Sequence, residues 1–135
     1  MKKFSSKELC PCHSQKKFQT CCEPFLSGSQ IPENPEKLMR SRYTAYCLSN
    51  LNYVQKTMLG RPLDNFNLRE ATLQAKKCKW ISLKVINSMV EENNLVGFVE
   101  FIAEYSSYGK IFSLHEKSKF QFSNEKWFYV DGIFM

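Results

Sequence analysis

Four of the six cysteines lie within thirteen residues, as Cys10-Pro11-Cys12, eight intervening residues, and then Cys21-Cys22. A segment this short cannot bury enough apolar surface to fold unaided. Zinc favours four soft ligands in a tetrahedron, and structural zinc sites are closed by four protein ligands. The spacing therefore predicts a small segment that folds around one Zn²⁺ ion, with the metal supplying much of its folding free energy.

The residues between the cysteines support this interpretation. Pro11 fixes its own φ, so Cys10 and Cys12 can flank one tight turn. Residues 15–22 are expected to form about two helical turns that return Cys21 and Cys22 to the same point, with Phe18 as a miniature core. His13 is a further possible ligand, ranked behind the four cysteines. Four thiolates leave no open coordination position, which favours a structural over a catalytic metal.

The N-terminus is charged and is not followed by the apolar stretch of a secretory signal. No apolar run approaches the roughly 20 residues needed to cross a bilayer. We therefore expect a cytoplasmic protein without a membrane partner. In a reducing compartment, clustered cysteines more often bind a metal than form disulfides. A disulfide pair and four unrelated thiols are the weaker alternatives.

The rest of the chain predicts an α+β domain. Eleven Phe and six Tyr are enough to build a core. We expect a zinc segment over residues 1–26, a Gly-, Ser- and Pro-containing linker over 27–35, and the α+β domain over 36–135. Asn34 and Asn50 suit helix N-caps. Helices are predicted over the following ranges: from residue 35 or 36 to 49, 51–59, and from 64 or 65 to 76.

After Cys78 the pattern changes to strands. Residues 95–105 alternate, with Val99 and Phe101 on one face and Glu100 on the other. Strands are predicted over 80–90, 95–105, 111–122 and 127–131, joined by short turns. Helices followed by four such strands are typical of an antiparallel meander packed on helices.

Two resemblances extend this interpretation. Residues 10–22 read CPCHSQKKFQTCC, which resembles the zinc-binding SEC-C motif of the translocation motor SecA and other bacterial proteins, usually CPCGSGKKYKKCC. The resemblance implies that all four cysteines of the motif, Cys10, Cys12, Cys21 and Cys22, bind zinc. The chain departs from the usual form at His13 and Gln15, which replace glycines. That change could stiffen the loop or alter its partner surface, and it removes no ligand.

The remaining chain resembles the YchJ family of bacterial proteins. The segments that carry this resemblance are residues 38–46, 99–101, 114–120 and 127–132. The resemblance implies a nuclear transport factor 2-like domain, in which a cone of helices packs against a curved sheet. Many relatives carry a second SEC-C motif at the C-terminus, and this chain ends at Met135 without one.

Two charges interrupt apolar faces of the domain. Arg42 lies in line with Leu38 and Tyr46 on the first helix, and Glu116 lies among apolar residues of the third strand. A buried charge must be paired or neutralised. We therefore expect Arg42 and Glu116 to meet inside the cone, as a structural ion pair or as the polar end of a ligand pocket. In the second case Tyr43, Glu100 or His115 could act with Glu116.

These features define three functional hypotheses. The first is a binding protein whose zinc segment contacts another protein and whose domain takes a protein or a small ligand. The second is a small-molecule enzyme, of the isomerase or hydratase kind, that uses the cone pocket. The third is contact with RNA or the ribosome. The net charge of +6 and five N-terminal lysines support it. These lysines are Lys2, Lys3, Lys7, Lys16 and Lys17. A homodimer through the sheet face of Phe98 and Ile102 is a further expectation.

Overall fold

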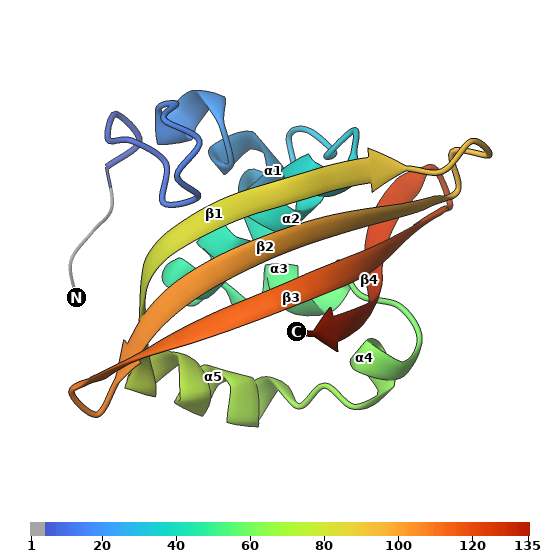
Figure 1. Cartoon of the computed structure of the whole chain (residues 1–135). Helices are drawn as coiled ribbons and strands as arrows, with labels where there is room; N and C mark the ends of the chain where they lie inside the picture. Colours follow the sequence, from blue (N-terminus) through green and yellow to red (C-terminus); the bar gives the residue numbers. More distant parts are fainter. Residues whose placement is uncertain (1–4) are drawn as a thin grey trace.

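A four-stranded antiparallel sheet forms one layer of the molecule, and the helices form the other. The computed structural model describes residues 5–135, and the sheet order is β1-β2-β3-β4 (Figure 1). The strands are β1 (Cys78–Val90), β2 (Val96–Ser107), β3 (Lys110–Ser123) and β4 (Lys126–Phe134). The helices are η1 (Phe18–Thr20), α1 (Glu23–Ser27), α2 (Pro35–Cys47), α3 (Leu51–Lys56), α4 (Arg61–Asp64) and α5 (Leu68–Lys77). The predicted α+β fold is confirmed.

The helices begin where their capping residues stand. Asn34 accepts a hydrogen bond from the backbone N–H of Lys37, and Asn50 caps α3 in the same way. The predicted helix over 51–59 is too long, because residues 57–59 leave the helix and run beside β4. The predicted third helix begins too early, because Asn67 caps α5 and the helix starts only at Leu68. The short helix α4 before it was not predicted. No helix within residues 5–135 has the length and apolar character needed to span a membrane.

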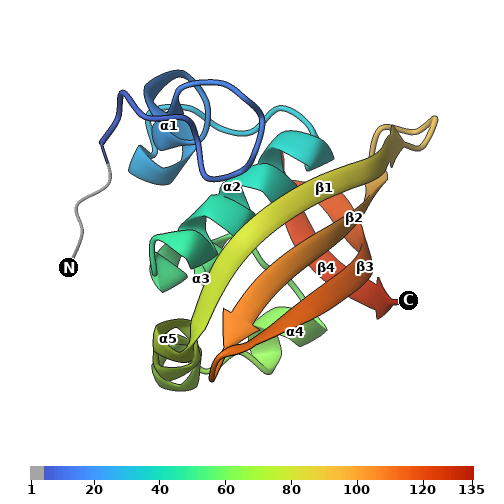
Figure 2. The ribbon, with the colours of Figure 1, turned by 60° about the vertical axis from the view of Figure 1, so that its left-hand side comes forward.

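The sheet curves around α2 and α3 (Figure 2). Alternation holds on β2, where Val99, Phe101 and Ala103 are buried on the inner face. On β3 the inner face includes Glu116, Ser118 and Phe120. β1 begins two residues before the predicted strand, and β4 continues to Phe134, three residues beyond the prediction. This longer β4 lies against residues 116–123 of β3.

The N-terminal segment packs on the side of α2 that faces away from the sheet (Figures 1 and 2). The predicted helix over 15–22 is wrong, because only the single turn η1 forms there. The predicted linker begins at Ser27, which is the last residue of α1, and the C-cap residue Gly28 has a φ of 85°. Phe18 does not form a separate miniature core. The segment shares one buried cluster with the domain, and its members include Cys10, Cys12, Phe18, Cys22, Leu38, Met39 and Tyr43.

Candidate metal centre and adjoining cavity

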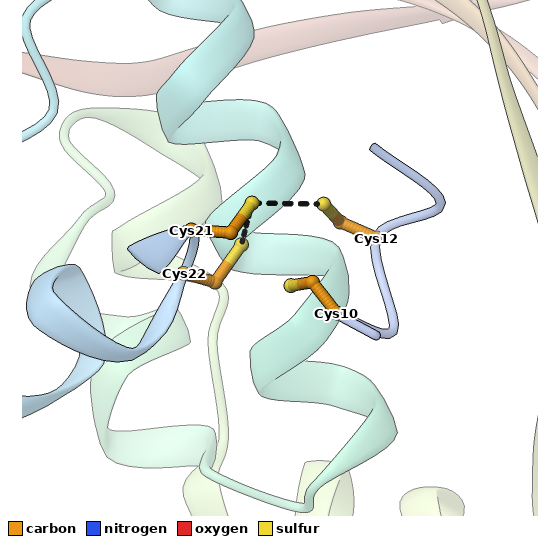
Figure 3. Close-up of side chains that lie close together, drawn as sticks. All are labelled: Cys10, Cys12, Cys21 and Cys22. Atoms are coloured by element: carbon orange, nitrogen blue, oxygen red, sulfur yellow. Dashed lines mark hydrogen bonds between the residues drawn. The ribbon is translucent and has the colours of Figure 1, made fainter. Parts of the chain in front are cut away.

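The four clustered cysteines converge on one point between two loops. Their Sγ atoms all lie within 4.8 Å of one another, and Figure 3 shows them directed toward a common centre. The Sγ atoms of Cys12 and Cys21 are 3.5 Å apart, and those of Cys21 and Cys22 are 4.0 Å apart. Zn–S bonds of about 2.3 Å in a tetrahedron place sulfurs about 3.8 Å apart. The donor set and its spacing therefore fit a tetrahedral metal ion.

A short antiparallel loop holds Cys10 and Cys12 in position. Leu9 and Lys17 form a β-bridge, and the N–H of Cys10 donates to the carbonyl of Lys16 at 2.8 Å. Cys22 is the N-cap residue of α1, so Cys21 and Cys22 lie where the chain enters that helix. The loop and the helix start together bring the two cysteine pairs to one place. All six cysteines of the chain are free thiols.

His13 and Gln15 both have a left-handed backbone, with φ of 62° and 70°. This conformation costs a residue with a Cβ roughly 1–2 kcal/mol, whereas glycine adopts it freely. It explains why glycine stands at these two positions in the usual motif. His13 is outside the cluster of candidate ligands, and its ring makes a T-shaped contact with Tyr43 at 6.2 Å.

Helix α2 contributes polar contacts to the cysteine cluster. The hydroxyl of Thr44 donates to Sγ of Cys22 at 3.4 Å, and the same oxygen lies 3.7 Å from Sγ of Cys10. Arg40 donates through Nη1 to the carbonyl of Cys12 at 2.8 Å. Sequence reasoning missed both residues. The sequence signal that could have found them is the i, i+4 spacing of Arg40 and Thr44, which places both on one face of the helix.

Three thiols of the cluster have pKa values that are shifted in different directions. A hydrogen bond from Cys10 holds the pKa of Cys12 far below its usual range. The same contact raises the pKa of Cys10 to about 11, and the bond from Cys10 also raises the pKa of Cys22. Metal binding must displace the protons that remain. An acidic pH therefore opposes metal binding.

A second feature is a cavity of about 310 Å³ between α2 and the inner face of the sheet. Arg42, Tyr43 and Glu116, three of the four pocket residues predicted from the sequence, line it. Glu100 does not line it. It lies on the opposite sheet face, where its carboxylate is 2.7 Å from Nε2 of His115. Glu100 and His115 are therefore separated from Glu116 by the sheet.

Arg42 and Glu116 line the same cavity without forming an ion pair, since none joins them within 4 Å in the described chain. A direct salt bridge is therefore absent, and the charge of Glu116 acts on Arg42 at longer range. Tyr129 connects the two charges instead. Its ring centroid lies 4.7 Å from Cζ of Arg42, and its hydroxyl donates to Oε2 of Glu116 at 3.0 Å.

Each charge has its own polar support. Arg42 donates through Nη1 to the Val54 carbonyl at 2.8 Å and to the Thr57 hydroxyl at 2.6 Å. Burial lowers the pKa of Arg42, because desolvation disfavours its charged form. The hydroxyl of Ser118 donates to Oε2 of Glu116 at 2.6 Å. Burial also raises the pKa of Tyr129, which keeps its hydroxyl protonated as a donor.

Gly132 on β4 makes room for this polar group. A Cβ at that position would lie 2.4 Å from the Tyr129 hydroxyl and 2.5 Å from Oε2 of Glu116. Sequence reasoning assigned no role in the pocket to Tyr129, Ser118 or Gly132. Ser118 could have been found from its i+2 position, which places it on the same strand face as Glu116.

The lysines and the proposed dimer face lie on the surface. Lys7, Lys16 and Lys17 are exposed, whereas Lys2 and Lys3 fall outside the described residues. Phe98 and Ile102 are half-buried on the outer sheet face, and the ammonium of Lys117 lies 5.0 Å from the Phe98 ring centroid. Nucleic-acid contact and dimer formation therefore stay predictions.

Comparison with known families decides the classification. Residues 34–132 match the model of the YchJ middle NTF2-like domain, and residues 7–24 match the SEC-C motif. The chain belongs to the YchJ family. Both resemblances seen in the sequence are thus confirmed, and the first match starts one residue before α2. In this YchJ-family protein the SEC-C segment and the NTF2-like domain share a buried core.

Solved structures show the same arrangement. A SEC-C motif-containing protein from Rhodopseudomonas palustris is 32% identical, with a TM-score of 0.84 over 92% of this chain and 96% of its own. One from Psychrobacter arcticus is 26% identical, with a TM-score of 0.82 over 93% of this chain and 82% of its own. The intermembrane space region of the chloroplast protein ARC6 shares the fold alone. It is 13% identical, with a TM-score of 0.58 over 74% of this chain and 92% of its own.

Proposed function

We propose that this protein is a binding protein of the cytoplasm in which one structural Zn²⁺ ion fixes the N-terminal segment on helix α2. The observation that carries the proposal is the convergence of the four Sγ atoms of Cys10, Cys12, Cys21 and Cys22 within 4.8 Å. Four thiolates suit zinc and leave no coordination position for a reacting water. Zinc held in this way stabilises structure and performs no chemistry.

The site is built into the domain, which supports a structural role. Thr44, which is fully buried, donates to one candidate ligand, and Arg40 donates to the backbone of another. Such outer contacts orient ligands and raise metal affinity. A metal held here ties α2 to the N-terminal segment, because both contribute to the same centre.

The exposed side of the segment is the surface we assign to a protein partner. Leu9 is 59% exposed directly beside the buried Cys10. Lys7, Lys16 and Lys17 lie exposed in the same short segment. An exposed apolar side chain in a segment with three exposed lysines and one exposed glutamate, Glu8, complements a protein surface that is apolar and, on balance, acidic.

Metal content tests the first half of the proposal. We expect the purified protein to retain one zinc per chain, and the Cys21→Ser/Cys22→Ser double variant to retain none. Cys78→Ser is the matched control, because Cys78 lies outside the cluster, and it should keep the full content. Equal zinc content in all three proteins would show that the metal is not held by these thiols.

A surface variant tests the partner without disturbing the metal. Leu9→Ser should keep its zinc, because Leu9 contributes only backbone to its bridge with Lys17. It should lose the proteins that the wild-type chain retains from cell extract. Leu95→Ser, at a comparably exposed apolar residue in the β1–β2 turn, should retain them. If Leu9→Ser still retains these proteins, the assigned surface is wrong. If the wild-type chain retains RNA in place of proteins, the result favours the basic residues as a nucleic-acid site.

A second role, in binding a small ligand, is favoured by one separate observation. Arg42 and Glu116 line one cavity although each is only 7% exposed. A few charged groups inside a mostly apolar cavity are the usual polar elements of a ligand site.

A further inference from the structure

The two charges in the cavity retain unused hydrogen-bonding capacity. Arg42 uses only Nη1, with the Val54 carbonyl and the Thr57 hydroxyl as acceptors. Glu116 uses only Oε2, which accepts from both Ser118 and Tyr129. Nε and Nη2 of Arg42 and Oε1 of Glu116 therefore have no hydrogen-bond partner among residues 5–135.

These atoms reach open space. Every fully buried side-chain nitrogen or oxygen in the described part of the chain has a hydrogen-bond partner. Atoms without a partner must therefore be reachable from open space. Arg42 and Glu116 are both almost enclosed by protein, and both line the cavity of about 310 Å³. The cavity is the open space that both side chains share.

Most of the remaining wall is aromatic, together with Met39, Met58, Ala103, Leu114 and Ser118. Its rings are those of Tyr43, Tyr46, Trp80, Phe101, Phe120, Tyr129 and Phe134. The rings of Tyr43 and Trp80 contact each other in a T-shaped arrangement, with 5.7 Å between their centroids. Ring-lined walls favour a flat, apolar body that stacks on them. The volume lies at the small end of the roughly 300–1,000 Å³ of ligand pockets, which limits the ligand to one or two rings.

The balance of charge determines the ligand's polar group. Arg42 offers donors and Glu116 offers an acceptor, and their formal charges cancel. An anionic ligand would gain from Arg42 but be repelled by Glu116, and a cationic ligand would meet the reverse situation. Building on the small-ligand role proposed above, we propose that the cavity binds a neutral, flat molecule of one or two rings whose polar group accepts from Arg42 and donates to Glu116, as a carboxamide or lactam does.

Three probes of one shape and different charge test the proposal on the full-length, zinc-loaded protein. The neutral probe is 2-naphthamide, the anion is 2-naphthoate and the cation is 2-naphthylmethylamine. In amide NMR titrations, we expect 2-naphthamide to shift the signals of Ala103 and Ser118 on the cavity wall. It should bind at least about tenfold more tightly than either ion, because each ion meets a like charge inside the cavity. Binding by no probe, or shifts confined to other parts of the surface, would overturn the proposal.

The Glu116→Gln variant adds a readout that a merely structural role would not change. It removes the negative charge and keeps the shape of the side chain. The affinity for 2-naphthoate should then rise at least about tenfold, because Arg42 is no longer opposed. Glu104→Gln, on the outer sheet face, should leave all three affinities unchanged. An unaltered preference in Glu116→Gln would contradict the proposal. If that variant does not fold, the three-probe comparison on the unmodified protein still decides.

Discussion

At the scale of single residues, two positions in the cysteine loop carry backbone strain. His13 and Gln15 hold left-handed φ angles that suit glycine. Their strain is not equally compensated, because the His13 ring contacts Tyr43 whereas Gln15 is exposed. The two replacements of the usual glycines should therefore differ in their effect on stability.

We expect Gln15→Gly to raise the free energy of unfolding of the zinc-loaded protein by about 0.5–1 kcal/mol, because relief of strain exceeds the entropy that glycine loses on folding. His13→Gly should raise the free energy of unfolding by less, because this variant also loses the ring contact with Tyr43. Urea unfolding measures both. Gln15→Ala is the control and should bring no gain, because it keeps a Cβ. A loss of stability in Gln15→Gly would show that the loop is not strained there.

Thr44 is the second residue with a specific role. Its hydroxyl donates to Sγ of Cys22, and its side chain is fully buried. Thr44→Val removes this donor at nearly constant shape. We expect zinc affinity to fall about 10-fold or more, as for other contacts behind metal ligands. Competition with a chromogenic chelator measures the change. Thr72→Val, on α5, should leave the affinity unchanged, and equal affinities in the two variants would deny Thr44 this role.

At the scale of elements, α2 connects the two functional regions. Arg40 and Thr44 contact the cysteine loops, whereas Arg42 and Tyr46 line the cavity. Tyr43 does both, through its contact with His13 and its place in the cavity wall. Residues 5–77 contribute no strand to the sheet, so its hydrogen bonds do not depend on the metal.

Chelation of the metal should therefore destabilise the N-terminal segment and leave the sheet unchanged. We expect hydrogen exchange to accelerate over residues 8–27, because the segment lacks a core of its own and depends on the metal. Protection in β2 and β3 should stay unchanged. Exchange mass spectrometry before and after removal of zinc measures both regions. Faster exchange throughout the sheet would mean that the metal stabilises the whole molecule, and unchanged exchange everywhere would mean that it stabilises neither part.

At the scale of the whole molecule, local rules predicted most of the architecture. Asn34 and Asn50 cap helices as expected, and alternation assigned the faces of β2 and β3. The four cysteines were found from spacing alone, because all of them lie in one short segment. Arg42 and Glu116 were found because each interrupts an apolar pattern.

The parts that were missed depend on contacts between distant segments. Residues 57–59 leave their helix because the backbones of Thr57 and Leu59 pair with Tyr129 on β4. The same contact brings Tyr129 between Arg42 and Glu116, which replaces the expected ion pair. Residues 15–22 likewise form only the single turn η1, and the segment packs into the core cluster of the domain. No local pattern contains these pairings.

The central claim is that Cys10, Cys12, Cys21 and Cys22 together hold one zinc ion. X-ray absorption at the zinc edge of the purified protein tests it most directly, because the method reports the type, number and distance of the ligand atoms. The account predicts four sulfur neighbours at about 2.3 Å, with an unchanged spectrum in His13→Gly. A shell containing a nitrogen or oxygen ligand, or fewer than four sulfurs, would contradict it.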